Sequence, residues 1–332
     1  SLLSLAMVDA LGAPVEFCPR DTFPPVTNYL PTRHFSLPPG TPTDDTSMAL
    51  CLATSLLSMR TFSPSSQAAN YIRWFRHGYL SATGHCFDIG NCTRKALKLW
   101  EQGEAQGLEV WKAEKGREWP WFKEQKGNGG LMRVLPVALV MWREPLVARR
   151  WARESSKTTH PAVMSQLACE VYVELVGGII RGEFYDPETR RLDKKLFVER
   201  LETWEGWKRD ERGLLRKENE RSQCEVLRQA MTGVGKLKRE KVSSSGYVLS
   251  TLQAAIWAFL ASDGFVEGAR LVVNLGDDAD TVGAVYGGLA GAWYGGVESD
   301  RERRQWWKDE TVTEWRRGLQ MAKEIVTIAE DI

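Results

Sequence analysis

The chain has 332 residues and 26% charged side chains, yet its formal net charge is only +1. This length allows a sizeable buried core, and the balanced charge argues against nucleic acid or another polyanion as a general partner. No apolar run reaches the roughly 20 residues needed to span a bilayer, so we expect no membrane association and a soluble protein.

Cysteine and histidine are sparse and scattered. The six cysteines show no Cys-x-x-Cys spacing, which indicates reduced thiols and an intracellular, cytoplasmic location. The four histidines show no His-Glu-x-x-His arrangement, so any metal ion is expected to have oxygen ligands. We also expect a monomer.

Apolar residues recur at intervals of three and four along most of the chain, whereas strand-like alternation is nearly absent. This periodicity predicts helices at 46–59, 66–80, 92–101, 131–143, 145–154, 161–181, 247–261, 264–274, 281–295 and 311–330. Segments 1–12 and 195–210 are also expected to be helical, and stretches rich in Pro, Gly and Ser are expected to be loops. The predicted fold class is a compact all-α domain.

No Pro/Gly/Ser-rich linker divides the chain, so residues 1–332 are expected to form a single domain. Segment 182–243 differs because it carries dense mixed charge and few apolar residues. We interpret it as a largely solvated insertion, with a surface for docking a partner as the alternative.

Two acidic clusters lie far apart in the sequence: Thr43-Asp44-Asp45-Thr46 and Asp277-Asp278-Ala279-Asp280-Thr281. Each precedes an apolar helical segment, where one carboxylate would suffice as a helix cap. Several carboxylates held together repel one another, and hard oxygen ligands suit Mg²⁺, Mn²⁺ or Ca²⁺. The clusters therefore predict a carboxylate metal centre, and the alternative is that they are only helix caps.

The helix predicted after the second cluster carries glycines at every fourth position, namely Gly283, Gly287, Gly291 and Gly295. Residues four apart lie on one side of a helix, so these glycines predict unusually close packing against another element. Such packing would hold the second acidic cluster rigidly against the first.

Four further segments complete a pattern with these clusters, namely Asp9-Ala-Leu-Gly-Ala-Pro-Val-Glu-Phe17, Cys86-Phe-Asp-Ile-Gly-Asn-Cys-Thr-Arg94, Gly127-Asn-Gly-Gly-Leu-Met-Arg133 and Thr158-Thr-His-Pro161. Taken in the order in which they occur along the chain, the six motifs resemble those of the ADP-ribosylglycohydrolase family. The resemblance covers nearly the whole chain outside 182–243. Two residues depart from the family pattern. The family usually has glycine where this chain has Val8, and it often has glycine where this chain has Asp277.

The resemblance implies an all-α fold with a dinuclear site for two divalent cations, Mg²⁺ or Mn²⁺. Carried over residue by residue, the ligands would be Thr43, Asp44, Asp45, Asp278, Asp280 and Thr281.

The resemblance also implies two catalytic carboxylates. Glu16 would lie on a mobile loop over the metals, although an ordinary exposed glutamate is the alternative. Asp88 matches an aspartate beside the reacting ribose in arginine-directed members, although it could instead cap the helix that starts near Asn91, which is itself expected to contact substrate.

Substrate-binding residues are expected in two further motifs. The loop Gly127-Asn128-Gly129-Gly130 precedes Met132 and offers backbone N–H groups suited to a diphosphate or a ribose hydroxyl. His160 matches a family histidine near the substrate, with a structural loop histidine as the alternative. Tyr247 could stack on adenine, although a tyrosine at this position more often belongs to the core.

The function implied is metal-dependent hydrolysis that releases ADP-ribose from a modified protein, with arginine as the expected acceptor. An O-linked ADP-ribosylserine or poly(ADP-ribose) hydrolase and a non-catalytic ADP-ribose-binding relative are the alternatives. A dinuclear phosphoesterase is a third alternative, but such an enzyme would normally have more than the four histidines of this chain.

Overall fold

The computed structural model describes residues 1–332 except 33, 106–118, 190 and 296–302. The longer helices run in the order α1 (Leu2–Gly12), α2 (Asp44–Met59), α3 (Pro64–His77), α4 (Asn91–Ala105), α5 (Trp119–Glu124), α6 (Leu135–Met141), α7 (Pro145–Lys157), α8 (Val163–Ile180), α9 (Lys194–Thr203), α10 (Glu218–Met231), α11 (Val248–Ala261), α12 (Phe265–Val273), α13 (Ala279–Gly295), α14 (Glu310–Gly318) and α15 (Ala322–Asp331). The strands β1 (Tyr185–Asp186) and β2 (Arg191–Leu192) pair antiparallel. The all-α prediction is therefore confirmed.

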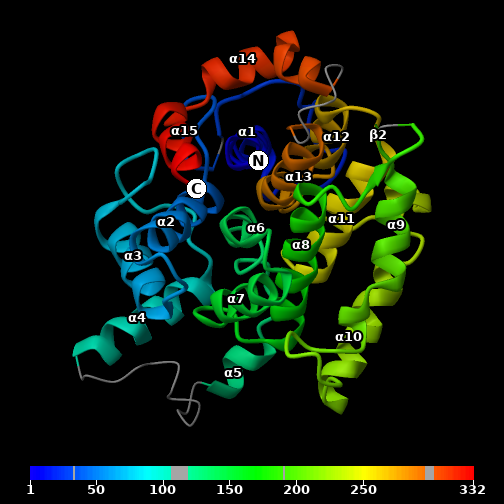
Figure 1. Ribbon diagram of the computed structural model, residues 1–332. Coiled ribbons are helices and arrows are strands. Elements are labelled where there is room, and N and C mark those ends of the chain that lie inside the picture. The colour runs from blue at the N-terminus through cyan, green and yellow to red at the C-terminus, as the bar shows by residue number, and fades with distance from the viewer. Residues whose placement is uncertain (33, 106–118, 190, 296–302) are drawn as a thin grey trace.

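Helices α1 and α13 lie side by side in the middle of the molecule, with α2, α3 and α4 on one flank and α9 and α10 on the other (Figure 1). Helix α8 packs against α7, α6 and α13. Among the described residues, α8 is the one helix long and apolar enough to cross a membrane, and 89% of it is buried inside the protein. This burial is the pattern of a core helix.

The predicted glycine face of α13 is confirmed at three of its four positions. A β-carbon at Gly283 would lie 2.7 Å from the carbonyl oxygen of Val8, and one at Gly287 would lie 2.3 Å from that of Ser4. A β-carbon at Gly291 would lie 2.5 Å from Ser4 Oγ, whereas at Gly295 the nearest atom among the described residues is 3.9 Å away. The backbone of α13 thus contacts α1 directly, which sets the second acidic cluster beside the residues of α1.

Several boundaries differ from the periodicity. The helix predicted at 311–330 is two helices, because Met321 adopts a left-handed φ of 58° and Gln320 N–H bonds to Gly40 O at 2.9 Å. Residues 131–134 form turns before α6, and the helix expected at 195–210 ends at Thr203. Helices α5 and α10 and the short hairpin were not predicted, because α10 has few apolar residues and α5 and the two strands are too short to show a period.

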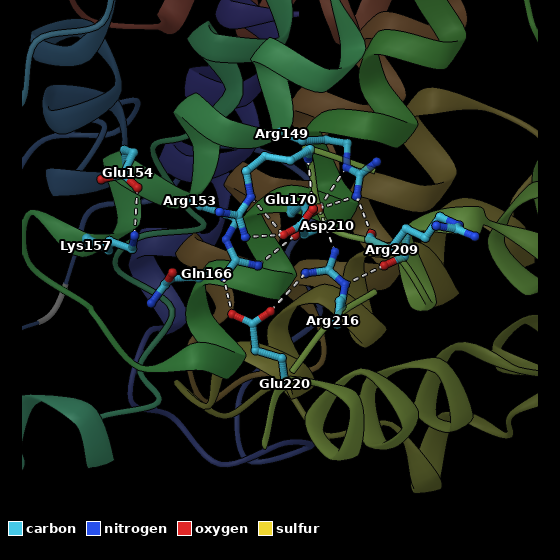
Figure 2. A network of polar contacts seen from close by, with 12 residues as sticks. Arg149, Arg153, Glu154, Lys157, Gln166, Glu170, Arg209, Asp210, Arg216 and Glu220 are labelled. Atoms are coloured by element: carbon cyan, nitrogen blue, oxygen red, sulfur yellow. Dashed lines mark hydrogen bonds and ion pairs between the residues drawn. The ribbon is translucent and has the colours of Figure 1, made fainter. Parts of the chain in front are cut away.

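Segment 182–243 is anchored more firmly than a solvated insertion would be. Glu170 of α8, which is fully buried, forms ion pairs with Arg149 at 2.7 Å, Arg153 at 3.2 Å and Arg216 at 2.7 Å (Figure 2). Arg216 belongs to the charged run of the segment and is itself buried, and it also lies 3.6 Å from Glu220. Part of this charged run therefore forms buried ion pairs that attach the segment to α7 and α8. We call the ion pairs around Glu170 the clamp.

Candidate functional site

The two acidic clusters meet where the N-termini of α2 and α13 converge beside α1. Thr43 is the N-cap of α2, and its hydroxyl lies 3.2 Å from Asp45 Oδ2 and 3.3 Å from Asp280 Oδ2. Thr281 Oγ1 lies 3.3 Å from the same Asp45 oxygen. Residues more than two hundred positions apart in the sequence are therefore in direct contact.

Asp9, in the middle of α1, organises the first cluster. Its buried carboxylate accepts hydrogen bonds from Thr43 N–H at 3.1 Å, from Thr43 Oγ1 at 2.9 Å and from Thr46 N–H at 3.1 Å, and the Thr46 hydroxyl also donates to it. Asp9 lies within one of the sequence motifs, but no role was predicted for it. The sequence feature that could have indicated such a role is a single carboxylate within a largely apolar helical segment.

Some carboxylate oxygens at this junction have no partner. Among the described residues, Asp45 Oδ1, Asp280 Oδ1 and Glu16 Oε2 are buried and accept no hydrogen bond. Oxygens of Asp9, Asp45 and Asp280 all lie within 4.8 Å of one another, as do oxygens of Glu16, Asp88 and Asp280. Unpartnered, convergent carboxylate oxygens are what hard divalent cations coordinate, so the residues fit such ions.

Burial without compensating positive charge raises the pKa of these carboxyl groups. Burial, followed by the charges of Asp88 and Asp278, raises the pKa of Glu16 to about 11. Burial raises the pKa of Asp88 to about 7, and it holds the pKa of Asp45 and Asp280 well above the ordinary value. The repulsion anticipated from the sequence is therefore present.

Glu16 and Asp88 lie close together at this junction, with a carboxylate oxygen of each within 4.8 Å of the other. The loop of Glu16 is tied to the second cluster, because Phe17 N–H bonds to Asp277 O at 2.6 Å and Asp277 N–H bonds to Cys18 O at 2.8 Å. Phe17, Asp88 and Asp277 all have left-handed φ angles of 54° to 60°. Non-glycine residues in this conformation are uncommon and cluster at functional sites.

A cavity of about 800 Å³ opens above the carboxylates. The predicted site residues that line it are Glu16, Asp44, Asp88, Asn91, Gly127, Asn128, Gly129, Met132, His160, Asp278, Asp280 and Thr281. Residues that line it without having been predicted are Phe17, Ile89, Gly90, Cys92, Thr93, Ser245, Gly246 and Asp277. All of these except Ser245 and Gly246 already lie within the motifs noted in the sequence, where no binding role was predicted for them. Ser245 and Gly246 directly precede the predicted Tyr247.

Four predicted residues do not line the cavity. Thr43 and Asp45 are buried beneath it. A β-carbon at Gly130 would lie 2.7 Å from Ser156 Oγ, so this glycine faces the core. Tyr247 is half-buried, packs against the core, and pairs with Gly127 through a β-bridge.

The glycine-rich loop is held over the second cluster. Asn128 donates from Nδ2 to Asp278 Oδ2 at 2.7 Å and to Thr251 Oγ1 at 2.9 Å, and its N–H bonds to Gly246 O at 3.2 Å. This arrangement links one side of the cavity to a predicted metal ligand.

The chain is similar to known proteins over nearly its whole length. A family model described as ADP-ribosylglycohydrolase matches residues 1–332. The chain is 33% identical over 305 residues to an ADP-ribosylarginine hydrolase Tri1 of Serratia proteamaculans, covering 89% of this chain and 70% of the relative.

Two further similarities span most of the chain. An ADP-ribosyl-[dinitrogen reductase] glycohydrolase of Rhodospirillum rubrum is 27% identical, with 89% of this chain and 84% of the relative covered. A solved structure named ADP-ribosylglycohydrolase-related protein complex superposes with a TM-score of 0.72 at 34% identity, covering 99% of this chain and 94% of that chain.

Proposed function

Because the chain belongs to the ADP-ribosylglycohydrolase family, we propose that it hydrolyses the bond between C1″ of ADP-ribose and a guanidino nitrogen of arginine on a modified protein. The observation that carries this proposal is the cavity whose base is a cluster of carboxylates with unpartnered oxygens. The relatives named ADP-ribosylarginine hydrolase support arginine as the acceptor. An ADP-ribosylated protein is then the substrate and ADP-ribose a product.

Two divalent cations, Mg²⁺ or Mn²⁺, would be held by Thr43, Asp44, Asp45, Asp278, Asp280 and Thr281. The unpartnered oxygens of Asp45 and Asp280 and the raised pKa values of both carboxyl groups support this assignment. When bound, the cations would supply Lewis-acid catalysis and offset the negative charge of the cluster.

The Glu16–Asp88 pair would move the proton that the reaction requires. The C1″–N bond breaks, a water oxygen bonds to C1″, and a proton ends on the departing guanidine nitrogen. Because the pKa of Glu16 is raised further than that of Asp88, Glu16 would hold the proton while Asp88 presents negative charge towards a cationic guanidinium. Asp88 is therefore assigned to guanidinium binding and proton transfer.

The opposite side of the cavity would bind the rest of ADP-ribose. Gly127 and Gly129 line it, and their lack of side chains leaves room for the His160 ring. Asn91, Met132 and His160 line it as well. This surface would receive the diphosphate and the ribose next to it. Tyr247 packs against the core, which favours a structural role over stacking on adenine.

Incubation with peptides ADP-ribosylated on arginine, serine or glutamate, in Mg²⁺ or in EDTA, tests the proposal. Release of free ADP-ribose from the arginine peptide in Mg²⁺, lost in EDTA, is the expected result. Preference for serine would identify the O-linked alternative, and binding of ADP-ribose without release from any peptide would identify the non-catalytic one. The monomeric state, the cytoplasmic location and the single-domain organisation remain predictions.

A further inference from the structure

Arg133 is a fully buried cation without a carboxylate partner among the described residues. Its guanidinium lies 4.7 Å from the centre of the Tyr71 ring. Nη2 donates to Ser155 O at 3.2 Å, Thr158 Oγ1 at 3.1 Å and Thr159 Oγ1 at 2.7 Å, while Nε and Nη1 have no partner among these residues. Burying an unpaired charge is costly, so its contacts call for an explanation beyond packing.

The shortest of these hydrogen bonds joins Arg133 to Thr159, whose hydroxyl also contacts His160. Thr159 Oγ1 lies 2.7 Å from Arg133 Nη2 and 2.8 Å from His160 Nδ1. A guanidinium can only donate, so the hydroxyl oxygen accepts from it, and the single hydroxyl hydrogen needs an acceptor. Among the described residues, His160 Nδ1 is the acceptor within reach, which makes Nδ1 unprotonated and places the ring proton on Nε2.

The Nε2 side of the ring lies under the glycine-rich loop at the cavity. A β-carbon at Gly127 would lie 3.3 Å from Nε2, and one at Gly129 would lie 3.1 Å from Nε2 and 2.6 Å from Cε1. The backbone of His160 is fixed as well, because its N–H bonds to Ser156 O at 2.7 Å and its carbonyl accepts from Ser156 Oγ at 2.9 Å. His160 lines the cavity, and within the described part of the chain Nε2 has no hydrogen-bond partner.

We infer that Thr159 and Arg133 are positioning residues that lock His160 as a neutral imidazole whose Nε2–H donates to an oxygen of bound ADP-ribose. The inference deepens the proposed function and rests on it for the identity of the ligand. Burial and the charge of Arg133 lower the pKa of His160 to about 3, in agreement with a neutral ring at cellular pH. Substrate recognition at this point then depends on a directed hydrogen bond and not on an imidazolium charge.

Long-range ¹H–¹⁵N correlation NMR of ¹⁵N-histidine-labelled protein tests the inference without any turnover. The chain has four histidines, so His160→Gln assigns the resonances directly. In the ligand-free wild type, His160 should show the Nε2–H tautomer, with an unprotonated Nδ1 that accepts a hydrogen bond, unchanged between about pH 5 and 8. An Nδ1–H tautomer, or a ring that titrates in this range, would overturn the inference.

Substitutions at two adjacent threonines separate positioning from general stability. Thr159→Val should move the Nδ1 resonance to that of a nitrogen without a hydrogen bond, and Thr159→Ser should restore it. Thr158→Val is the matched control, because the Thr158 hydroxyl also accepts from Arg133 but donates to Ser155 O and not to the His160 ring. An Nδ1 resonance unaltered by Thr159→Val would refute the relay.

Calorimetry with ADP-ribose supplies the second readout. Thr159→Val should weaken ADP-ribose binding by about tenfold, the order expected when one hydrogen bond to a charged ligand is impaired. Thr159→Ser should bind nearly as well as wild type, and so should Thr158→Val. Equal weakening by the two valine substitutions would assign the effect to packing and overturn the relay. Failure of wild type to bind ADP-ribose would instead contradict the proposed function.

Discussion

Asp9 and Asp88 are both carboxylates near the same site, but their surroundings give them different tasks. The Asp9 carboxylate accepts hydrogen bonds from Thr43 and Thr46, so it positions the loop that bears Asp44 and Asp45. Asp88 lines the cavity in a left-handed conformation and has no such set of donors. A side chain exposed to the cavity can meet the substrate, whereas one enclosed by donors can only orient its neighbours.

Asp88→Ala should reduce the release of ADP-ribose from modified arginine by about 10²–10⁴-fold, the range of general acid–base catalysis. The loss on modified serine should be smaller, since serine offers no guanidinium for the carboxylate to hold. Initial rates on the two peptides, for wild type and variant, measure both effects. The wild type should also act faster on arginine than on serine.

Ile89→Ala is a nearby control, because Ile89 lines the same cavity without ionisable chemistry. Near-normal arginine activity in Asp88→Ala, or equal wild-type rates on the two acceptors, would contradict the assigned role of Asp88. The assignment as an ADP-ribosylglycohydrolase would stand in either case.

At the level of elements, the helices with strong apolar periodicity were predictable from the sequence and the weakly patterned ones were not. Helix α10 is mostly polar and is anchored by the buried Cys224, Leu227 and Met231, a set too small to stand out in the pattern. The break between α14 and α15 depends on a contact with Gly40, which periodicity within the segment cannot report. Local sequence therefore predicts elements where burial is continuous, and tertiary contacts decide the rest.

Gly287→Ala should destabilise the protein because a β-carbon there would lie 2.3 Å from the backbone oxygen of Ser4, which cannot rotate away. Separating α1 from α13 to relieve this overlap should cost about 1–3 kcal/mol of unfolding free energy or more. Denaturant unfolding in EDTA measures the change. Gly295→Ala is the matched control in the same helix, since in the described part of the chain the nearest atom to its β-carbon would be 3.9 Å away. Equal stability of the two variants would show that the α1–α13 contact tolerates a side chain.

Glu170→Gln should also destabilise the protein, through the clamp between α7, α8 and the 182–243 segment. The substitution leaves Arg149, Arg153 and Arg216 buried around a neutral group, and breaking a buried ion pair typically costs about 3–5 kcal/mol. Glu218→Gln removes an exposed partner of Arg221 and should change stability by less than about 1 kcal/mol. Unfolding curves followed by circular dichroism distinguish the two. A similar small effect at Glu170 would mean that the clamp contributes little.

At the level of the whole molecule, the site exists only because distant segments of the chain meet. Sequence motifs predicted most of the residues that line the cavity, and the glycine spacing of α13 predicted the close packing that brings the two acidic clusters together. The tie of Asp9 to Thr46 and the relay from Arg133 through Thr159 to His160 were not predicted, because each depends on the mutual orientation of side chains from different elements. The charged 182–243 segment was only partly understood, since a charge run alone does not indicate which arginine is buried.

The same assembly makes the stability of the cation-free protein depend on pH. The pKa of Asp9 is raised to about 6 and that of Asp88 to about 7, both chiefly by burial, against an unfolded value near 4. The folded state therefore binds more protons than the unfolded state between about pH 4 and pH 7, and unfolding free energy falls as pH rises through this range. Thermal unfolding in EDTA should show this decline. A melting temperature that rises steadily over the same range would contradict it.

Divalent cations should reverse the decline, because they bind the ionised carboxylates of the folded state. At a hundredfold excess over Kd, each site should add about 2.7 kcal/mol to the unfolding free energy, so Mg²⁺ should raise the melting temperature at pH 7. Asp280→Asn removes one repelling carboxylate, so in EDTA this variant should melt above wild type, whereas in excess Mg²⁺ wild type should melt above the variant. Asp277→Asn is the control, because Asp277 is exposed and is not a predicted ligand. If Mg²⁺ stabilised Asp280→Asn as strongly as wild type, Asp280 could not be an essential ligand.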